Sequence, residues 1–239
     1  MSKKSQVSDT TEEFSYLSDD ALYFDSACQS LRPQSVIDAM REYYTDFNSC
    51  GERVKYKWGA EVDSRVKNTR EKILKLLKLS DKDYFVSFTL NTTYGINLIL
   101  DQIRPDGFAK VVTSDIEHNS PFLSTMTFSR KHNLPREVIS RKSDGSIDLA
   151  EADFANALVV MNCVSNIDGR KMANLSAVAR RIRESGGVFI IDASQTMAFH
   201  STWLAEQISH EKPDAICFSS HKMYGPARRY SNPFLSMLS

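Results

Sequence analysis

The sequence predicts an α/β fold built on a mainly parallel β-sheet with helices on both faces. From residue 84 onward, short apolar runs alternate with helical segments. Parallel strands need crossover connections, usually helices, which then cover both faces of the sheet. Several of the runs also end in polar residues, as expected where strands deliver side chains to a ligand-binding edge. The expected strands are Tyr84–Phe88, Lys110–Thr113, Glu137–Ser140, Leu158–Met161, Val188–Ile191 and Ala215–Phe218.

Helices are predicted from apolar residues that recur at helical spacing. One begins at Pro33, a residue suited to a first turn, and carries Ile37, Tyr44 and Phe47 on one face. Glycine after a helix permits the left-handed residue that ends it, as expected at Gly186. Further helices are expected over Val62–Leu79, Thr92–Gln102, Pro121–His132 and Ala173–Glu184.

The composition is that of an ordinary globular protein with one α/β domain, with 41% hydrophobic and 25% charged residues in 239. The 30 basic and 30 acidic side chains cancel, so no nucleic acid and no anionic membrane is expected as a partner. No apolar stretch approaches the ~20 residues that span a bilayer. Residues 1–20 are polar and predicted to be a mobile tail, not a signal peptide. The four cysteines lack metal-type spacing, which favours a reducing cytoplasmic location.

Lys222 and Asp192 are the most informative residues of the chain. Each follows an apolar run that is expected to be a buried strand, so each lies at the rim of the sheet. A lysine and a carboxylate at this spacing predict pyridoxal phosphate chemistry. The lysine forms a Schiff base with the cofactor aldehyde, and the carboxylate keeps the pyridine nitrogen protonated. The alternative for Asp192 is a cap of the next short helix, and a lone loop lysine is usually solvated.

Thr92 and Thr93 follow another strand and open a helix. Hydroxyl groups and the positive end of a helix dipole suit a phosphate group. An ordinary helix N-cap is the alternative interpretation.

His118 lies in a loop after the strand that ends near Thr113. Taken alone, it is better explained as a surface loop histidine, and the functional interpretation is a ring that lies flat on a cofactor. Asp115 and Glu117 stand beside it, but no second ligand cluster supports a metal site, so no metal is expected.

Asn166 and His221 complete the candidate set. Asn166 is predicted to donate to a phenolic oxygen, although its segment is also a plain turn signal. His221, next to Lys222, is a donor suited to phosphate.

Taken together, these segments resemble the class V aminotransferase family, in the branch that includes cysteine desulfurases and selenocysteine lyases. The resemblance runs from Tyr23 to Pro226. It rests on the highly specific segments SSHKMYGP (219–226) and DASQ (192–195) and on the moderately specific NTTYGIN (91–97) and EHNS (117–120).

The resemblance implies a role for each candidate. Lys222 is the implied Schiff-base lysine, Asp192 pairs with the pyridinium nitrogen, and His118 stacks on the ring. The implied contacts to the phenolic oxygen come from Gln195 and Asn166, and those to phosphate from Thr92, Thr93, Ser219 and His221.

The family also implies a seven-stranded large domain, a small C-terminal domain, an amino-acid substrate and a homodimer. The reaction is open among desulfuration, transamination, elimination and epimerisation, with a desulfurase-like lyase favoured. A non-catalytic fragment or pseudoenzyme that retains part of the pocket is the alternative. An unrelated nucleotide-binding protein is disfavoured because the sequence lacks a glycine-rich phosphate loop.

The resemblance ends after Pro226. We therefore expect an incomplete cofactor-binding domain over 21–226, flanked by the tail 1–20 and by a non-family tail over 227–239. The small domain, its substrate-binding arginine and the desulfurase cysteine loop are expected to be missing, and no cysteine here matches that nucleophile. A frameshift after Gly225 is the hypothesis for this ending. The strand that should return into the sheet is also expected to be absent, leaving an unpaired edge.

Overall fold

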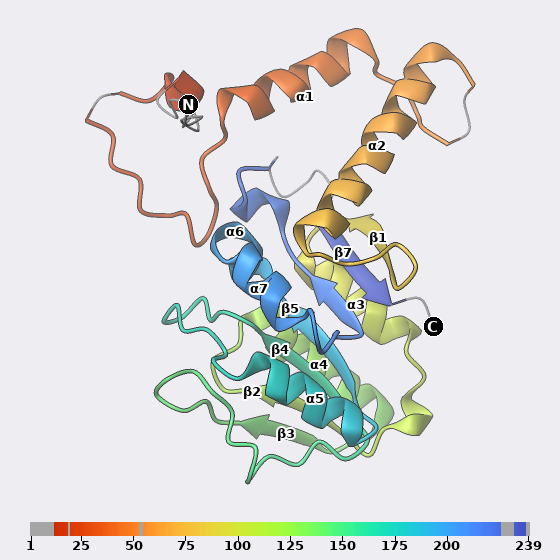
Figure 1. Cartoon of the computed structure of the whole chain (residues 1–239), viewed down its shortest axis with the longest axis vertical. Helices are drawn as coiled ribbons and strands as arrows, with labels where there is room; N and C mark the ends of the chain where they lie inside the picture. The colour runs from red at the N-terminus through yellow and green to blue at the C-terminus, as the bar shows by residue number, and fades with distance from the viewer. Residues whose placement is uncertain (1–11, 19, 53–54, 226–231, 238–239) are drawn as a thin grey trace, which may run out of the picture.

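The computed structural model describes residues 12–18, 20–52 and 55–225, together with the backbone of 232–237. A seven-stranded sheet forms its centre, with strand order β1-β7-β6-β5-β4-β2-β3 (Figure 1). The run from β6 to β3 is parallel, and β7 is antiparallel to both of its neighbours. The strands are β1 (Tyr84–Thr89), β2 (Lys110–Ser114), β3 (Arg136–Ile139), β4 (Ala157–Asn162), β5 (Val188–Asp192), β6 (Ala215–Cys217) and β7 (Asn232–Met237).

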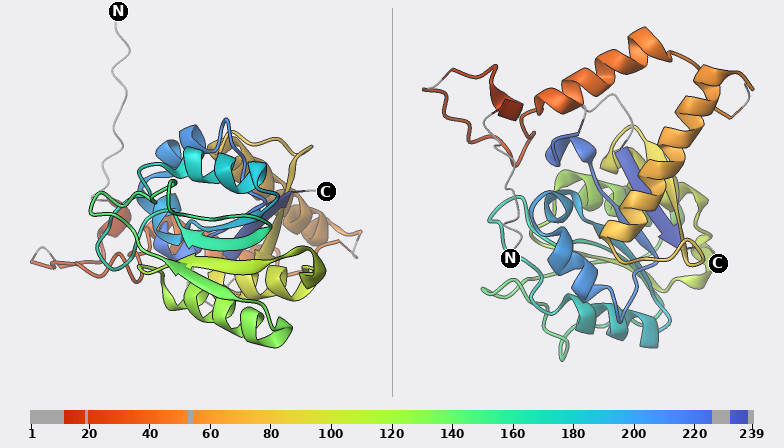
Figure 2. Two further views of the ribbon diagram at one scale, coloured as in Figure 1. Left: turned by 90° about the horizontal axis from the view of Figure 1, so that it is seen from below. Right: turned by 45° about the horizontal axis from the view of Figure 1, so that its top comes forward.

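Helices cover both faces of this sheet, as a parallel sheet requires (Figure 2, left). Every residue of β4 is buried, and its side chains alternate between two apolar clusters. Val159 and Met161 join the cluster that includes Leu175 of α5, whereas Val160 joins the cluster that includes Phe128 of α4. The helices are α1 (Gln34–Asp46), α2 (Lys57–Leu76), α3 (Thr92–Gln102), α4 (Asn119–His132), α5 (Leu175–Glu184), α6 (Ser194–Phe199) and α7 (Ser201–Gln207), with short 3-10 turns η1 (Glu12–Phe14), η2 (Pro105–Gly107) and η3 (Ser220–Lys222).

Helix α1 lies away from the sheet, and the chain returns to it along α2 (Figures 1 and 2). No residue of α1 is buried, and Ile37 and Tyr44 are exposed. In the part of the chain that the structure describes, no helix combines the length and apolarity needed to cross a membrane.

The predicted α/β fold is confirmed, and each of the six expected strands is present. Helix α3 has the predicted bounds, whereas α2 begins at Lys57, five residues before the expected Val62. Gly186 has a φ of 71°, the left-handed conformation expected after α5. The short helix α7 was not predicted, and α6 entered the sequence analysis only as the short helix that Asp192 caps in the alternative interpretation.

The expected absence of a returning strand was wrong. Residues 232–237 form β7, which pairs with β1 on one side and β6 on the other. Without β7, the backbone N–H and C=O groups on one edge of β1 and one edge of β6 would lack hydrogen-bond partners, and residues 232–237 provide them. The junction at 226–231 and most of the predicted tail 1–20 lie outside the described residues.

Candidate active site

A pocket lies at the carboxyl ends of the parallel strands, the edge at which α/β proteins bind ligands. Its cavity measures about 150 Å³. All nine residues that the sequence singled out line it: Thr92, Thr93, His118, Asn166, Asp192, Gln195, Ser219, His221 and Lys222. The structure therefore brings together residues as far apart in the sequence as Thr92 and Lys222. The role of each residue remains a prediction.

Lys222 and Asp192 enter the pocket from neighbouring strands. Asp192 is the last residue of β5, and Lys222 lies in the η3 turn that follows β6. The two residues are 4% and 9% exposed respectively, so an opposite pair of ionisable groups is held largely away from water. One oxygen of Asp192, Oδ1, accepts a hydrogen bond from Ser194 N at 2.9 Å, which fixes the carboxylate at the start of α6.

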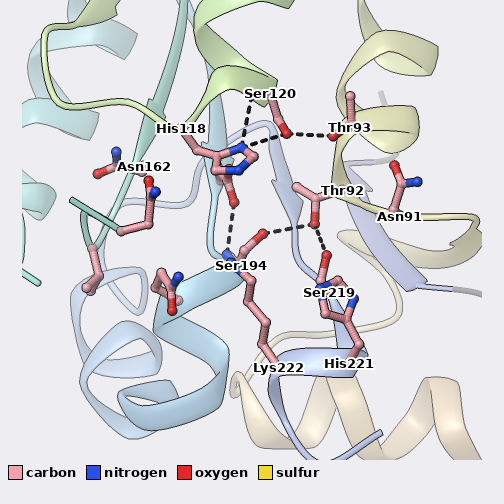
Figure 3. A pocket seen from close by; sticks show the side chains of 14 residues that line it. Asn91, Thr92, Thr93, His118, Ser120, Asn162, Ser194, Ser219, His221 and Lys222 are labelled. Atoms are coloured by element: carbon pink, nitrogen blue, oxygen red, sulfur yellow. Dashed lines mark hydrogen bonds between the residues drawn. The ribbon is translucent and has the colours of Figure 1, made fainter. Parts of the chain in front are cut away.

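Three hydroxyl groups meet at the start of α3. Thr92 Oγ1 lies 2.9 Å from Ser194 Oγ and is also hydrogen-bonded to Ser219 Oγ (Figure 3). Asn91 caps this helix, because its side chain accepts from Tyr94 N at 2.8 Å. A helix N-terminus lined with hydroxyls has the donors and the positive potential that a phosphate group requires.

His118 belongs to a second hydroxyl chain on the other side of the pocket. It is the N-cap of α4, and its Nδ1 accepts from Ser120 N at 3.0 Å. The same nitrogen lies 2.9 Å from Ser120 Oγ, which in turn is hydrogen-bonded to Thr93 Oγ1 (Figure 3).

The N-terminal segment is hydrogen-bonded to residues of the site and of its flanking turn. Gln195 Nε2 donates to the carbonyl oxygen of Ala27 at 2.8 Å. Ser30 accepts from Tyr224 N at 2.8 Å and donates to the carbonyl oxygen of His221 at 3.0 Å. In this arrangement the amide of Gln195 uses one of its two N–H donors on backbone, which leaves the second N–H for the predicted contact with a ring oxygen.

A buried ion pair lies behind the pocket. Arg141 Nη2 is 3.4 Å from Glu117 Oε1, and the two side chains are 1% and 0% exposed. Glu117 also accepts from Asn162 N at 2.7 Å and from the Ser114 hydroxyl, while Arg141 donates to the carbonyl oxygen of Asn162 at 2.6 Å. Burial raises the pKa of Glu117 to about 7, with the nearby Arg141 opposing this shift. Burial lowers the pKa of Arg141.

The three residues that the sequence analysis weighed as metal ligands are each engaged in protein contacts. Glu117 faces Arg141, Asp115 accepts from Arg141 N at 3.0 Å, and His118 caps α4. Across the described ranges, no group of three or more His, Cys, Asp or Glu side chains has the arrangement of a metal site.

Sequence reasoning missed five residues of the pocket and the arginine behind it. Asn162 ends β4 beside Asp192 in the sheet register, so the rule that picked out Asp192 would also have found it. Ser194 and Ser120 are neighbours of chosen residues. Arg141 carried no signal, because it follows β3 in an isolated bridge to Ile147. The pocket residues missed are Asn91, Ser120, Asn162, Val164 and Ser194.

The cysteines occupy two kinds of environment. Cys163 and Cys217 are buried, and burial raises the pKa of both thiols, so they act as small apolar side chains. Cys28 and Cys50 are exposed.

Comparison with known proteins connects this pocket to one family. The family model of aminotransferase class-V matches residues 22–227. A probable cysteine desulfurase from Pyrococcus abyssi is 27% identical over 212 residues, which cover 86% of this chain and 51% of that protein. A cysteine desulfurase from Pectobacterium atrosepticum is 25% identical, with 86% and 51% covered.

The fold comparison agrees. The apo structure of a cysteine desulfurase from Thermococcus onnurineus NA1 matches with a TM-score of 0.78 and 25% identity, over 91% of this chain and 54% of that one. The chain thus spans about half the length of the relatives it matches. With a family model that covers most of its length, the chain belongs to the aminotransferase class-V family.

Proposed function

We propose that this chain binds pyridoxal 5'-phosphate through Lys222 and contributes the cofactor half of an enzyme that acts on an amino acid, of the cysteine desulfurase type. The observation that carries the proposal is that a buried lysine and a buried carboxylate line one small cavity. The relatives that match are cysteine desulfurases, and this favours the same class of reaction.

The residues present fit such a cofactor. The cluster of Thr92, Ser194 and Ser219 at the start of α3 provides donors for a phosphate group. Asp192 has one oxygen fixed by Ser194 N, and a carboxylate in this position suits a protonated ring nitrogen. His118 lines the same cavity with an aromatic face.

Bound pyridoxal phosphate would supply an electron sink for a carbanion at the substrate α-carbon. The chain's own side chains would do the rest. Lys222 Nζ would hold the cofactor and would be the group that moves a proton at the substrate α-carbon as base and acid. Asp192 would keep a proton on the ring nitrogen, and the buried setting of both residues limits access of water.

Covalent trapping tests the proposal. The purified chain is incubated with pyridoxal phosphate, reduced with borohydride and digested, and the modified peptide is identified by mass spectrometry. We expect the label on Lys222 and its loss in Lys222→Ala, with the fold retained because a lysine at the rim contributes little packing. Lys72→Ala, at an exposed position on α2, is the matched control and should keep the label. Labelling spread over surface lysines, with none on Lys222, would contradict the proposal.

Asp192→Ala tests the role of the carboxylate independently of the lysine. We expect weaker cofactor binding and a changed absorption spectrum, because the ring nitrogen loses its partner. An unchanged affinity and spectrum would remove Asp192 from the assignment.

A non-catalytic fragment or pseudoenzyme that keeps the pocket is the second candidate, favoured by the chain spanning about half of its relatives' length. Sulfide release from cysteine in the presence of a thiol reductant, with other amino acids tested in parallel, distinguishes the two. Cofactor trapped on Lys222 with no turnover of any amino acid would support the second candidate.

We also propose that the chain assembles as a homodimer. Helix α1 buries none of its residues, and Ile37 and Tyr44 are exposed on it. Light scattering coupled to gel filtration measures the assembly state, and a monomer at micromolar concentration would contradict this part of the proposal.

A further inference from the structure

We infer that Ser120, with Thr93 behind it, is a positioning residue that holds His118 as the neutral tautomer with its proton on Nε2. The significance of this tautomer for cofactor chemistry rests on the proposed function, whereas the tautomer itself does not. Ser120 was not among the residues that the sequence singled out, and the resemblance assigns it no role.

The first step concerns Nδ1 of His118. The backbone N–H of Ser120 points to this nitrogen at 3.0 Å and can only donate. Nδ1 must therefore present its lone pair, and a neutral imidazole that accepts at Nδ1 carries its proton at Nε2. Protonation of Nδ1 would set one N–H against another and would also remove the cap of α4.

The second step concerns the order of the hydroxyl protons. Ser120 Oγ lies 2.9 Å from His118 Nδ1 and is hydrogen-bonded to Thr93 Oγ1. Ser120 has a single hydroxyl proton. If that proton goes to Nδ1, the bond to Thr93 must be donated by Thr93. The chain of donation then runs from Thr93 Oγ1 to Ser120 Oγ and on to His118 Nδ1.

The third step is the consequence for the pocket. Thr93 stands in the first turn of α3, and His118 is the N-cap of α4, so the hydroxyl chain connects the starts of two helices that line one cavity. The imidazole is thereby fixed in rotation and presents Nε2–H as its donor. A histidine fixed in this way can donate a hydrogen bond from Nε2–H, but it cannot take a proton at Nδ1 without breaking its contacts to Ser120.

Nitrogen NMR of the chain labelled with ¹⁵N-histidine tests this inference without any cofactor. The sequence has five histidines, and the His118 signals are assigned by their loss in His118→Gln. At pH 8, where an ordinary histidine is neutral, we expect a protonated Nε2 and an unprotonated Nδ1. A proton on Nδ1, or a doubly protonated ring at this pH, would overturn the inference.

Substitution of the hydroxyls separates a positioning role from a merely structural one. Ser120→Ala keeps the backbone donor but removes the hydroxyl, so the Nδ1 resonance should move downfield, as for a nitrogen that has lost one donor. Ser120→Thr should restore the original resonance. Ser124→Ala removes a buried hydroxyl one turn further along α4 and should leave His118 unchanged.

Thr93→Val provides a second variant if Ser120→Ala fails to fold. It leaves Ser120 in place but removes the donor behind it, so a smaller downfield movement is expected. An Nδ1 resonance that is unchanged in every folded variant would show that the hydroxyl chain does not act on His118. Failure of cofactor trapping on Lys222 would instead refute the proposed function and leave the tautomer result intact.

Discussion

Raising the pH from 5 to 8 is predicted to weaken the fold by about 2 to 3 kcal/mol through one side chain, Glu117. This carboxyl group is completely buried beside Arg141, and burial raises its pKa from 4.5 to about 7. Between these two values the unfolded chain has released the proton while the folded chain still holds it. The stability contributed by this group is therefore complete below about pH 4.5 and declines as the pH rises toward 7.

The magnitude follows from the difference of 2.5 units, 7 minus 4.5. Each unit corresponds to about 1.4 kcal/mol, so the full change is roughly 3 kcal/mol, and the part that falls between pH 5 and pH 8 is about 2.5 kcal/mol. This is a large share of the ~5–15 kcal/mol by which a typical domain is stable.

Urea unfolding followed by circular dichroism at constant ionic strength measures this change. Glu117→Gln is the reference, since glutamine has the same shape and does not titrate. The free energy of unfolding of the wild type, minus that of Glu117→Gln, should fall by about 2 to 3 kcal/mol from pH 5 to pH 8. Other titrating groups cancel in this difference. A difference that stays constant across the range would refute the reasoning.

Three further changes are predicted from the same structure. Arg141→Met should lower the free energy of unfolding by about 3 to 5 kcal/mol at pH 8, because Glu117 is mostly charged there and would lose its buried partner. Urea unfolding at pH 5 should show a smaller loss. Equal losses at both pH values would contradict this prediction. Gly186→Ala should lower the free energy of unfolding by about 1–2 kcal/mol, because the residue has a φ of 71° and a new Cβ would lie 2.7 Å from Asn156 Oδ1. An unchanged urea midpoint would argue against this strain. Ile190→Ala, at a fully buried position in β5, should cost about 2–5 kcal/mol by the same measurement, and a cost well below this would mean that the core closes over the cavity.

The sequence indicated the sheet and the pocket because both depend on local signals. Apolar runs marked each strand from β1 to β6, and the polar residue at each strand end pointed to one edge. Asp192 and Lys222 were found by this rule, and the structure places both at the same cavity. Asn162 obeys the same rule, because it ends β4 beside Asp192 in the sheet register.

The remaining features depend on contacts between distant segments. Arg141 reaches Glu117 across 24 positions from a loop with no pattern of its own, so only the folded structure reveals the ion pair. Strand β7 was missed because its segment departs from the family-like sequence, whereas its pairing is decided by the backbone groups of β1 and β6. A family resemblance predicts the structure of the segments that this chain shares with its relatives, and it makes no prediction for a segment whose sequence differs from theirs.

The contacts of the N-terminal segment have a consequence for folding. Ala27 bonds to Gln195 across 168 positions, and Ser30 bonds to His221 across 191. Contacts of such high sequence separation form slowly, because a long loop must close first. On a ribosome, the segment that contains Ala27 and Ser30 must wait for its partners until nearly the whole described sequence has emerged. The contacts of this segment with the pocket residues Gln195 and His221 are then a late step of biosynthesis, after β2 to β5 have had time to pair.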